Sequence, residues 1–70
     1  MTIIIEQTSA TSALVITGEP YVRDVMRRLG VLGMRDVKTR LWWLPAARVD
    51  DIAAMLEQRR HNVEIRQTLG

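Results

Sequence analysis

Residues 13–30 read ALVITGEPYVRDVMRRLG, and within this stretch a strand gives way to a helix. Residues 13–17 are aliphatic and largely β-branched, which is typical of a strand. Pro20 suits the first turn of a helix, where its missing N–H is not needed. Gly30 favours a helix end. The apolar side chains between them have the spacing of one helical face and predict a helix over residues 20–29; they are Tyr21, Val22, Val25, Met26 and Leu29.

Further elements lie on both sides of this stretch. Residues 2–7 are β-branched and predict a strand, joined to residues 13–17 by a short polar loop over 8–12. Residues 31–40 predict a strand with a tight turn, and residues 41–44 predict an apolar strand that Pro45 ends. Apolar residues at helical spacing predict a helix near residues 46–60. Val63 and Ile65 alternate with charged residues, which indicates a half-buried final strand.

The predicted order of elements is therefore β-β-α-β-β-α-β, in a single domain of residues 1–70. Without its first strand, this order is the split β-α-β pattern of ferredoxin-like folds. Because crossover connections are right-handed, both helices should lie on one face of a mainly antiparallel sheet. The sequence thus predicts an α+β fold with an extra N-terminal strand and one bare sheet face.

The position of the N-terminal strand raises a conflict. Residues 2–7 could pair with residues 13–17 as a hairpin, but the C-terminal strand needs the same edge in the ferredoxin-like order. Pairing between two chains would satisfy both demands. The bare face, which would also hold Val15 or Ile16, is an apolar patch that monomers seldom leave exposed. We therefore expect a homodimer whose interface residues are Ile3, Ile5, Leu41 and Trp43.

The composition argues against several classes of protein. The 70 residues include no cysteine and one histidine, so we expect neither disulfides nor a metal site. No apolar run approaches the roughly 20 residues of a membrane span. The N-terminus lacks the basic region of a signal peptide, so we expect a cytoplasmic protein. No nucleophile has an evident partner base, so we expect no catalytic residues, no cofactor and no enzymatic activity.

Basic residues supply one candidate site. The net charge is +2, and this is too small to indicate nucleic acid without a local cluster. Arg35, Lys38 and Arg40 lie in or beside one predicted hairpin, and Arg66 could lie near it. They indicate either a phosphate-binding edge or a solvated turn, and the negative charge of Asp36 opposes the first interpretation.

The two tryptophans supply a second candidate. Trp42 and Trp43 are adjacent, so they point to opposite faces of a strand. Trp42 shares its face with Leu44, and we expect both beneath the helices. Trp43 would lie on the bare face, where it either packs against the N-terminal strand or a second copy, or stacks on a base.

Several short motifs lie between residues 14 and 66. They are Ile16-Thr17-Gly18, Tyr21, Leu29-Gly30 and Thr39-Arg40-x-Trp42-x-Leu44-Pro45, followed by an amphipathic helix. The hairpin Asp36-Val37-Lys38-Thr39-Arg40-Leu41-Trp42 has the form Asp-x-x-Thr-Arg-x-Trp. In these motifs the chain resembles the HARP domain of annealing helicases, and it is similar to short domains of bacterial and phage DNA-processing proteins.

This resemblance implies binding to structured or single-stranded DNA by a module without activity of its own. The chain departs from the family at Trp43, where polar residues are tolerated, and we expect it to be free-standing, without the neighbouring motor or nuclease domain of the family. We therefore expect a non-enzymatic nucleic-acid-binding module that acts as a small accessory protein. It would be a protein of a phage or mobile element, an adaptor, or a truncated module. The alternative is a protein–protein interaction module, such as a phage-type effector that binds a host protein.

Overall fold

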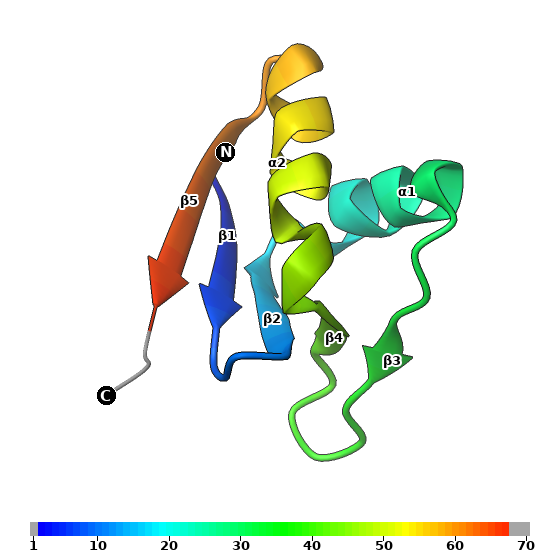
Figure 1. Ribbon diagram of the computed structural model, residues 1–70, viewed down its shortest axis with the longest axis vertical. Coiled ribbons are helices and arrows are strands. Elements are labelled where there is room, and N and C mark those ends of the chain that lie inside the picture. The colour runs from blue at the N-terminus through cyan, green and yellow to red at the C-terminus, as the bar shows by residue number, and fades with distance from the viewer. Residues whose placement is uncertain (1, 68–70) are drawn as a thin grey trace.

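One five-stranded sheet and two helices make up residues 2–67, the part of the chain that the computed structural model describes (Figure 1). The strands are β1 (Thr2–Gln7), β2 (Ser12–Thr17), β3 (Met34–Arg35), β4 (Trp42–Pro45) and β5 (Asn62–Gln67). The helices are α1 (Glu19–Leu29) and α2 (Val49–Gln58), and a short 3-10 helix, η1 (Ala46–Arg48), precedes α2. The predicted α+β class and order of elements are confirmed.

The strand order is β3-β4-β2-β1-β5, which places β1 inside the sheet. β1 pairs in an antiparallel manner with β2 and in a parallel manner with β5, and the remaining pairs are antiparallel. The ferredoxin-like order would place β5 beside β2, but here β1 lies between them. Both edges of β1 are therefore paired within one chain. The expected conflict over the edge of β2 does not arise, and β1 needs no partner strand from a second copy.

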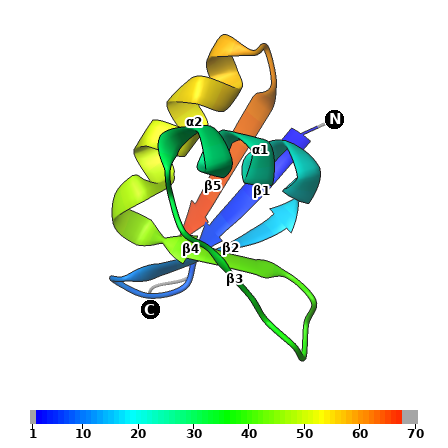
Figure 2. The same ribbon diagram turned by 90° about the vertical axis from the view of Figure 1, so that its right-hand side faces the viewer.

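Both helices lie on one face of the sheet (Figures 1 and 2). The hydrophobic core lies between them and this face. Ile3 and Ile5 of β1 are both 0% exposed, and the half-buried Ile4 between them points to the other face. Ile3 and Ile5 therefore do not form a surface that a second copy could contact, because β1 is an interior strand and both side chains are buried beneath the helices of their own chain. Val15 is also a core residue, so it does not lie on the bare face.

Two elements are shorter than predicted. Only Met34 and Arg35 of the segment 31–40 form a strand, because the Asp36 and Thr39 side chains hydrogen-bond to backbone N–H groups and favour a turn. The helix predicted near residues 46–60 begins with η1 and is α-helical only over Val49–Gln58. Neither helix of residues 2–67 has both the length and the apolar character that a membrane span requires.

Polar and aromatic contacts connect α1 to the end of α2. The Arg59 guanidinium donates a hydrogen bond to Asp24 Oδ2 over 2.6 Å, and Arg28 Nε lies 3.4 Å from the same oxygen. The ring of Tyr21, on α1, also contacts the ring of His61, which follows α2, and the two ring centroids are 4.7 Å apart. The pKa of Asp24 lies below its ordinary value of 3.8, chiefly because of the hydrogen bond from Arg59.

Candidate nucleic-acid interface

A turn over residues 36–41 closes the hairpin between β3 and β4 and extends beyond the sheet (Figure 2). The Asp36 N–H donates to the Leu41 carbonyl, and the Arg40 N–H donates to the Asp36 carbonyl, both over 2.8 Å. The Thr39 hydroxyl oxygen accepts a hydrogen bond from the Leu41 N–H over 3.3 Å. Arg40 has a φ of 61°, in the left-handed region, which lets the chain turn back into β4. This network holds the backbone that carries Lys38 and Arg40.

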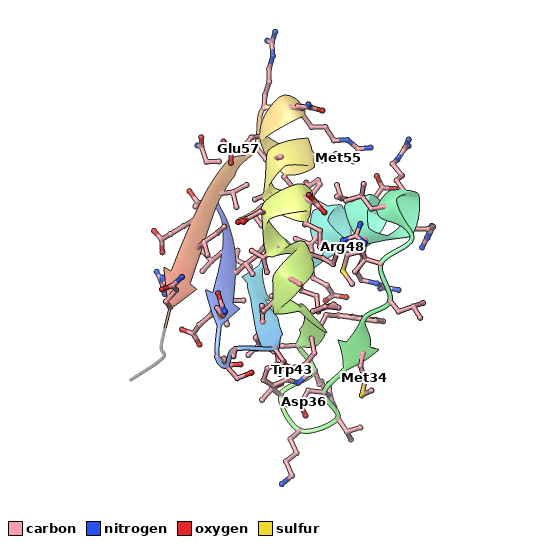
Figure 3. All side chains as sticks on the ribbon, viewed as in Figure 1. Met34, Asp36, Trp43, Arg48, Met55 and Glu57 are labelled. Atoms are coloured by element: carbon pink, nitrogen blue, oxygen red, sulfur yellow. The ribbon has the colours of Figure 1, made fainter. Side chains whose placement is uncertain are left out.

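The carboxylate of Asp36 is part of this turn. Its Oδ1 accepts a hydrogen bond from the Lys38 N–H over 2.9 Å. The pKa of Asp36 lies below 3.8, mainly because of this hydrogen bond, with smaller contributions from Thr39 and from the Trp43 indole. Figure 3 shows Asp36 and Trp43 at the same end of the molecule. Asp36 therefore supports the turn, although its charge lies among the cations that we expect to bind phosphate.

The basic side chains fall into two groups. The first group lies within 4 Å of carboxylates, and its members are Arg23, Arg28, Arg48, Arg59 and Arg66. The second group forms no ion pair with any carboxylate of residues 2–67; its members are Arg27, Arg35, Lys38, Arg40 and Arg60. The three cations of the hairpin all belong to this second group. None of the three is therefore held in an ion pair, although the carboxylate of Asp36 lies in the same turn.

Sequence reasoning placed Arg66 near the hairpin, but the structure separates them. Arg66 lies on β5, and β3 and β5 form the two opposite edges of the sheet. The Arg66 guanidinium also pairs with Glu64 on the same strand. Arg66 is therefore not part of the hairpin cluster.

Trp43 and Met34 lie on the face of the sheet opposite the helices. The ladder aligns Trp43 with Met34 on one side and with Leu14 on the other, and β1 continues the row with Glu6. Leu14 is 9% exposed and Trp43 is half-buried. Leu41, which precedes β4, is half-buried as well. The expectation that Trp43 points away from the helices agrees with this register.

Trp42 lies on the helix face, packed against the edge of the core. The guanidinium carbon of Arg23 lies 4.4 Å from the centroid of the Trp42 ring. The indole N–H of Trp42 is buried and has no acceptor within residues 2–67. The sequence predicted Trp42 as a core residue but did not predict its contact with Arg23. A local sequence pattern does not show which residue of a helix will contact a strand later in the chain.

Trp42 and Arg23 also line a groove of about 300 Å³ between α1 and the segment that leads to β3. Its other lining residues are Met26, Arg27, Gly30, Val31, Leu32 and Gly33. A second groove of about 280 Å³ includes Trp43, Met34 and Pro45 on its wall. Each tryptophan thus contributes to a separate groove at the β3–β4 edge.

The side chains of residues 2–67 do not bring three carboxylate or histidine groups together as a metal site would. Comparisons of the chain with protein-family models, with curated proteins and with solved structures found no match.

Proposed function

We propose that this protein is a non-enzymatic nucleic-acid-binding module that contacts DNA phosphates through the β3–β4 hairpin. The cations that do so are Arg35, Lys38 and Arg40. Positively charged side chains that lack an internal counter-charge attract the phosphate backbone and release its bound counterions. A fixed turn also reduces the entropy that is lost when these side chains become ordered on binding.

The proposal rests on the exposure of the hairpin cations and on their lack of carboxylate partners in the part of the chain that the structure describes. The three side chains are exposed and have no carboxylate partner within residues 2–67. The basic and acidic residues of the chain nearly cancel, with a net charge of +2, so the excess of positive charge at the hairpin is a local property of the surface. A surface of this kind favours anionic partners over neutral ones.

The resemblance to the HARP domain also favours the β3–β4 hairpin as the DNA-binding part of the chain. Three residues of its Asp-x-x-Thr-Arg-x-Trp motif, Asp36, Thr39 and Arg40, take part in the hydrogen bonds of the turn. The fourth, Trp42, lies beneath α1 beside Arg23. We therefore propose that the motif specifies a rigid, basic hairpin and that structured or single-stranded DNA is its ligand.

Binding to labelled single-stranded and forked DNA tests the proposal. The affinity should fall steeply between about 50 and 200 mM salt. Lys38→Gln and Arg40→Gln should each weaken binding and reduce the slope of log affinity against log salt by about 1. Arg28→Gln is the matched control, because Arg28 already pairs with Asp24 on α1. Absence of binding at low salt, or equal losses in all three variants, would contradict the proposal.

Exposed aliphatic residues favour a second candidate function, which is binding to a protein. Leu32, Met34 and Val37 are 88%, 71% and 91% exposed, and all three lie on the connection between α1 and β4. Exposed apolar side chains that are grouped in this way mark interaction surfaces. A protein partner of this surface, such as a host protein, would contact these apolar side chains with an apolar surface of its own. Binding that depends on Leu32 and changes little with salt would favour this alternative.

A further inference from the structure

The groove that Arg23 and Trp42 line, between α1 and the segment that leads to β3, differs in chemical character from the rest of the surface. Its floor is formed by Met26, Val31 and the ring of Trp42, and its rim includes Arg23 and Arg27. None of the carboxylates of residues 2–67 lines it. Its volume of about 300 Å³ is at the lower end of the range for ligand pockets. The groove therefore combines an apolar, aromatic floor with a cationic rim.

Arg23 and Trp42 form a preorganised stack in this groove. The guanidinium of Arg23 lies over the Trp42 ring at 4.4 Å, and its Nη1 atom also lies 3.3 Å from Glu19 Oε1. The Arg23 side chain therefore contacts both the ring and the carboxylate of Glu19. Flat guanidinium and aromatic surfaces are those on which unstacked nucleic-acid bases are bound.

Two further arginines in this region remain free to bind an anion. Arg27 lines the groove and forms no ion pair with residues 2–67. Arg35 lies directly opposite Trp42 in the β3–β4 ladder, so the two side chains share one face with Cβ atoms about 5 Å apart. Guanidinium groups can bind a phosphate through two parallel hydrogen bonds.

The charge distribution favours this groove over the opposite face of the sheet. On that face Trp43 and Leu14 are in register with Glu6, and Glu64 lies opposite Ile4 on the neighbouring strand. Arg66 pairs with Glu64 and lies opposite Glu6, so these residues give this part of the face no excess of positive charge that would attract a phosphate backbone. On the helix side, Arg27 lines the groove, and Arg35 lies beside Trp42 on the neighbouring strand; neither forms an ion pair with a carboxylate of residues 2–67.

We infer that the groove binds one nucleotide unit of a single strand. Its base lies against the Arg23–Trp42 stack, and its phosphate is bound by Arg27 and Arg35. This inference rests on the proposed function and extends it, because it places the strand on the helix side of β4. Trp43 then lies outside the nucleic-acid site.

Fluorescence of Trp42 tests the inference. The chain has two tryptophans, so Trp43→Phe leaves Trp42 as the sole indole. Titration of this variant with oligothymidylate should quench the Trp42 emission, because a base would lie against the Arg23–Trp42 pair. An abasic oligonucleotide of the same length should bind more weakly and should not quench.

Charge-removal variants provide the second measurement. In the otherwise unmodified chain, Arg27→Gln should lower the affinity for oligothymidylate about tenfold, as expected for the loss of a charged hydrogen bond. Arg60→Gln is the matched control, because Arg60 is an exposed arginine without an ion pair that lies outside the groove. Equal melting temperatures would show that both variants keep their fold.

The outcomes separate the inference from the proposed function. If Lys38→Gln weakens binding while Arg27→Gln resembles Arg60→Gln, the groove is not the site and the hairpin proposal remains. Equal quenching by the abasic strand would show that the phosphate is bound without a base in the groove, and would overturn the base contact. If the unmodified chain binds no oligonucleotide at low salt, both proposals are overturned.

Discussion

Gly18, which precedes α1, lies against Ile3 of the interior strand β1. A β-carbon placed on Gly18 would lie 2.6 Å from Cγ1 of Ile3. Gly18 also has a φ of 87°, in the left-handed region that disfavours residues with a side chain. The insertion of β1 beside β2 thus constrains the residue at which the chain passes from β2 into α1.

Replacing Gly18 should therefore destabilise the fold for two reasons. Gly18→Ala combines the cost of a left-handed backbone, about 1 kcal/mol, with the displacement of Ile3, and together these should lower the free energy of unfolding by about 2–4 kcal/mol. Urea denaturation followed by circular dichroism measures this difference.

Gly30→Ala is a matched control for the steric effect. Gly30 also has a left-handed φ, of 69°, but among residues 2–67 no atom outside its chain neighbours lies within 4 Å of a β-carbon built there. This variant should lose only the backbone contribution of about 1 kcal/mol. Equal losses for the two alanine variants would mean that the contact between Gly18 and Ile3 does not limit stability.

The ion pair between Arg59 and Asp24 should make stability depend on pH in the acidic range. The lowered pKa of Asp24 means that the folded state favours its ionised form. This contribution to stability is present above the ordinary pKa of 3.8 and is lost as the pH falls through the lower pKa of the folded protein.

Arg59→Gln should raise the pKa of Asp24 toward 3.8, which a carboxyl NMR titration would detect. The dependence of unfolding free energy on pH below about 4 should become shallower in the same variant. Arg60→Gln, at the adjacent position, is the control and should leave the titration of Asp24 unchanged. A similar shift in both variants would show that the general charge at the end of α2, rather than the hydrogen bond, lowers the pKa of Asp24.

Asp36 should have opposite effects on the turn and on DNA binding. Asp36→Asn keeps an oxygen that can accept the hydrogen bond from the Lys38 N–H, and it removes a negative charge from the cation cluster. Affinity for single-stranded DNA should then rise about two- to fivefold at low salt. Asp36→Ala removes the same charge together with the acceptor, so its melting temperature should fall further. Weaker DNA binding by Asp36→Asn, at an unchanged melting temperature, would contradict the role given to this charge.

The sheet face opposite the helices should mediate self-association. Trp43, Leu14 and Ile4 lie on this face, and the exposed Met34 extends it to the β3 edge. Since β1 has partners on both sides, this apolar face is the remaining basis for expecting a homodimer. Trp43→Glu should shift a micromolar dimer to monomer in sedimentation velocity, and Gln58→Glu on α2 is the control of equal charge. A monomeric wild-type chain at high micromolar concentration would rule out the dimer.

The candidate site was only partly predictable from the sequence. Arg35, Lys38 and Arg40 are near one another in the chain, so a hairpin brings them together in any register. Arg23 and Arg27 were not predicted as site residues, because they resemble the solvated face of a helix. Their relation to Trp42 depends on how α1 lies over β4, which a local pattern does not show.

The sequence by itself determined the type and order of the elements and the buried face of α1. Val22, Val25 and Met26 recur at helical spacing, because periodicity records which side of a helix avoids water, whereas the run Ile3-Ile4-Ile5 has no alternation that could show which of its side chains are buried. Only the tertiary structure decided that β1 lies between β2 and β5, since strand order depends on packing between residues far apart in the chain. It likewise decided which charges remain free, because Asp24 pairs with Arg59 across 35 positions of sequence.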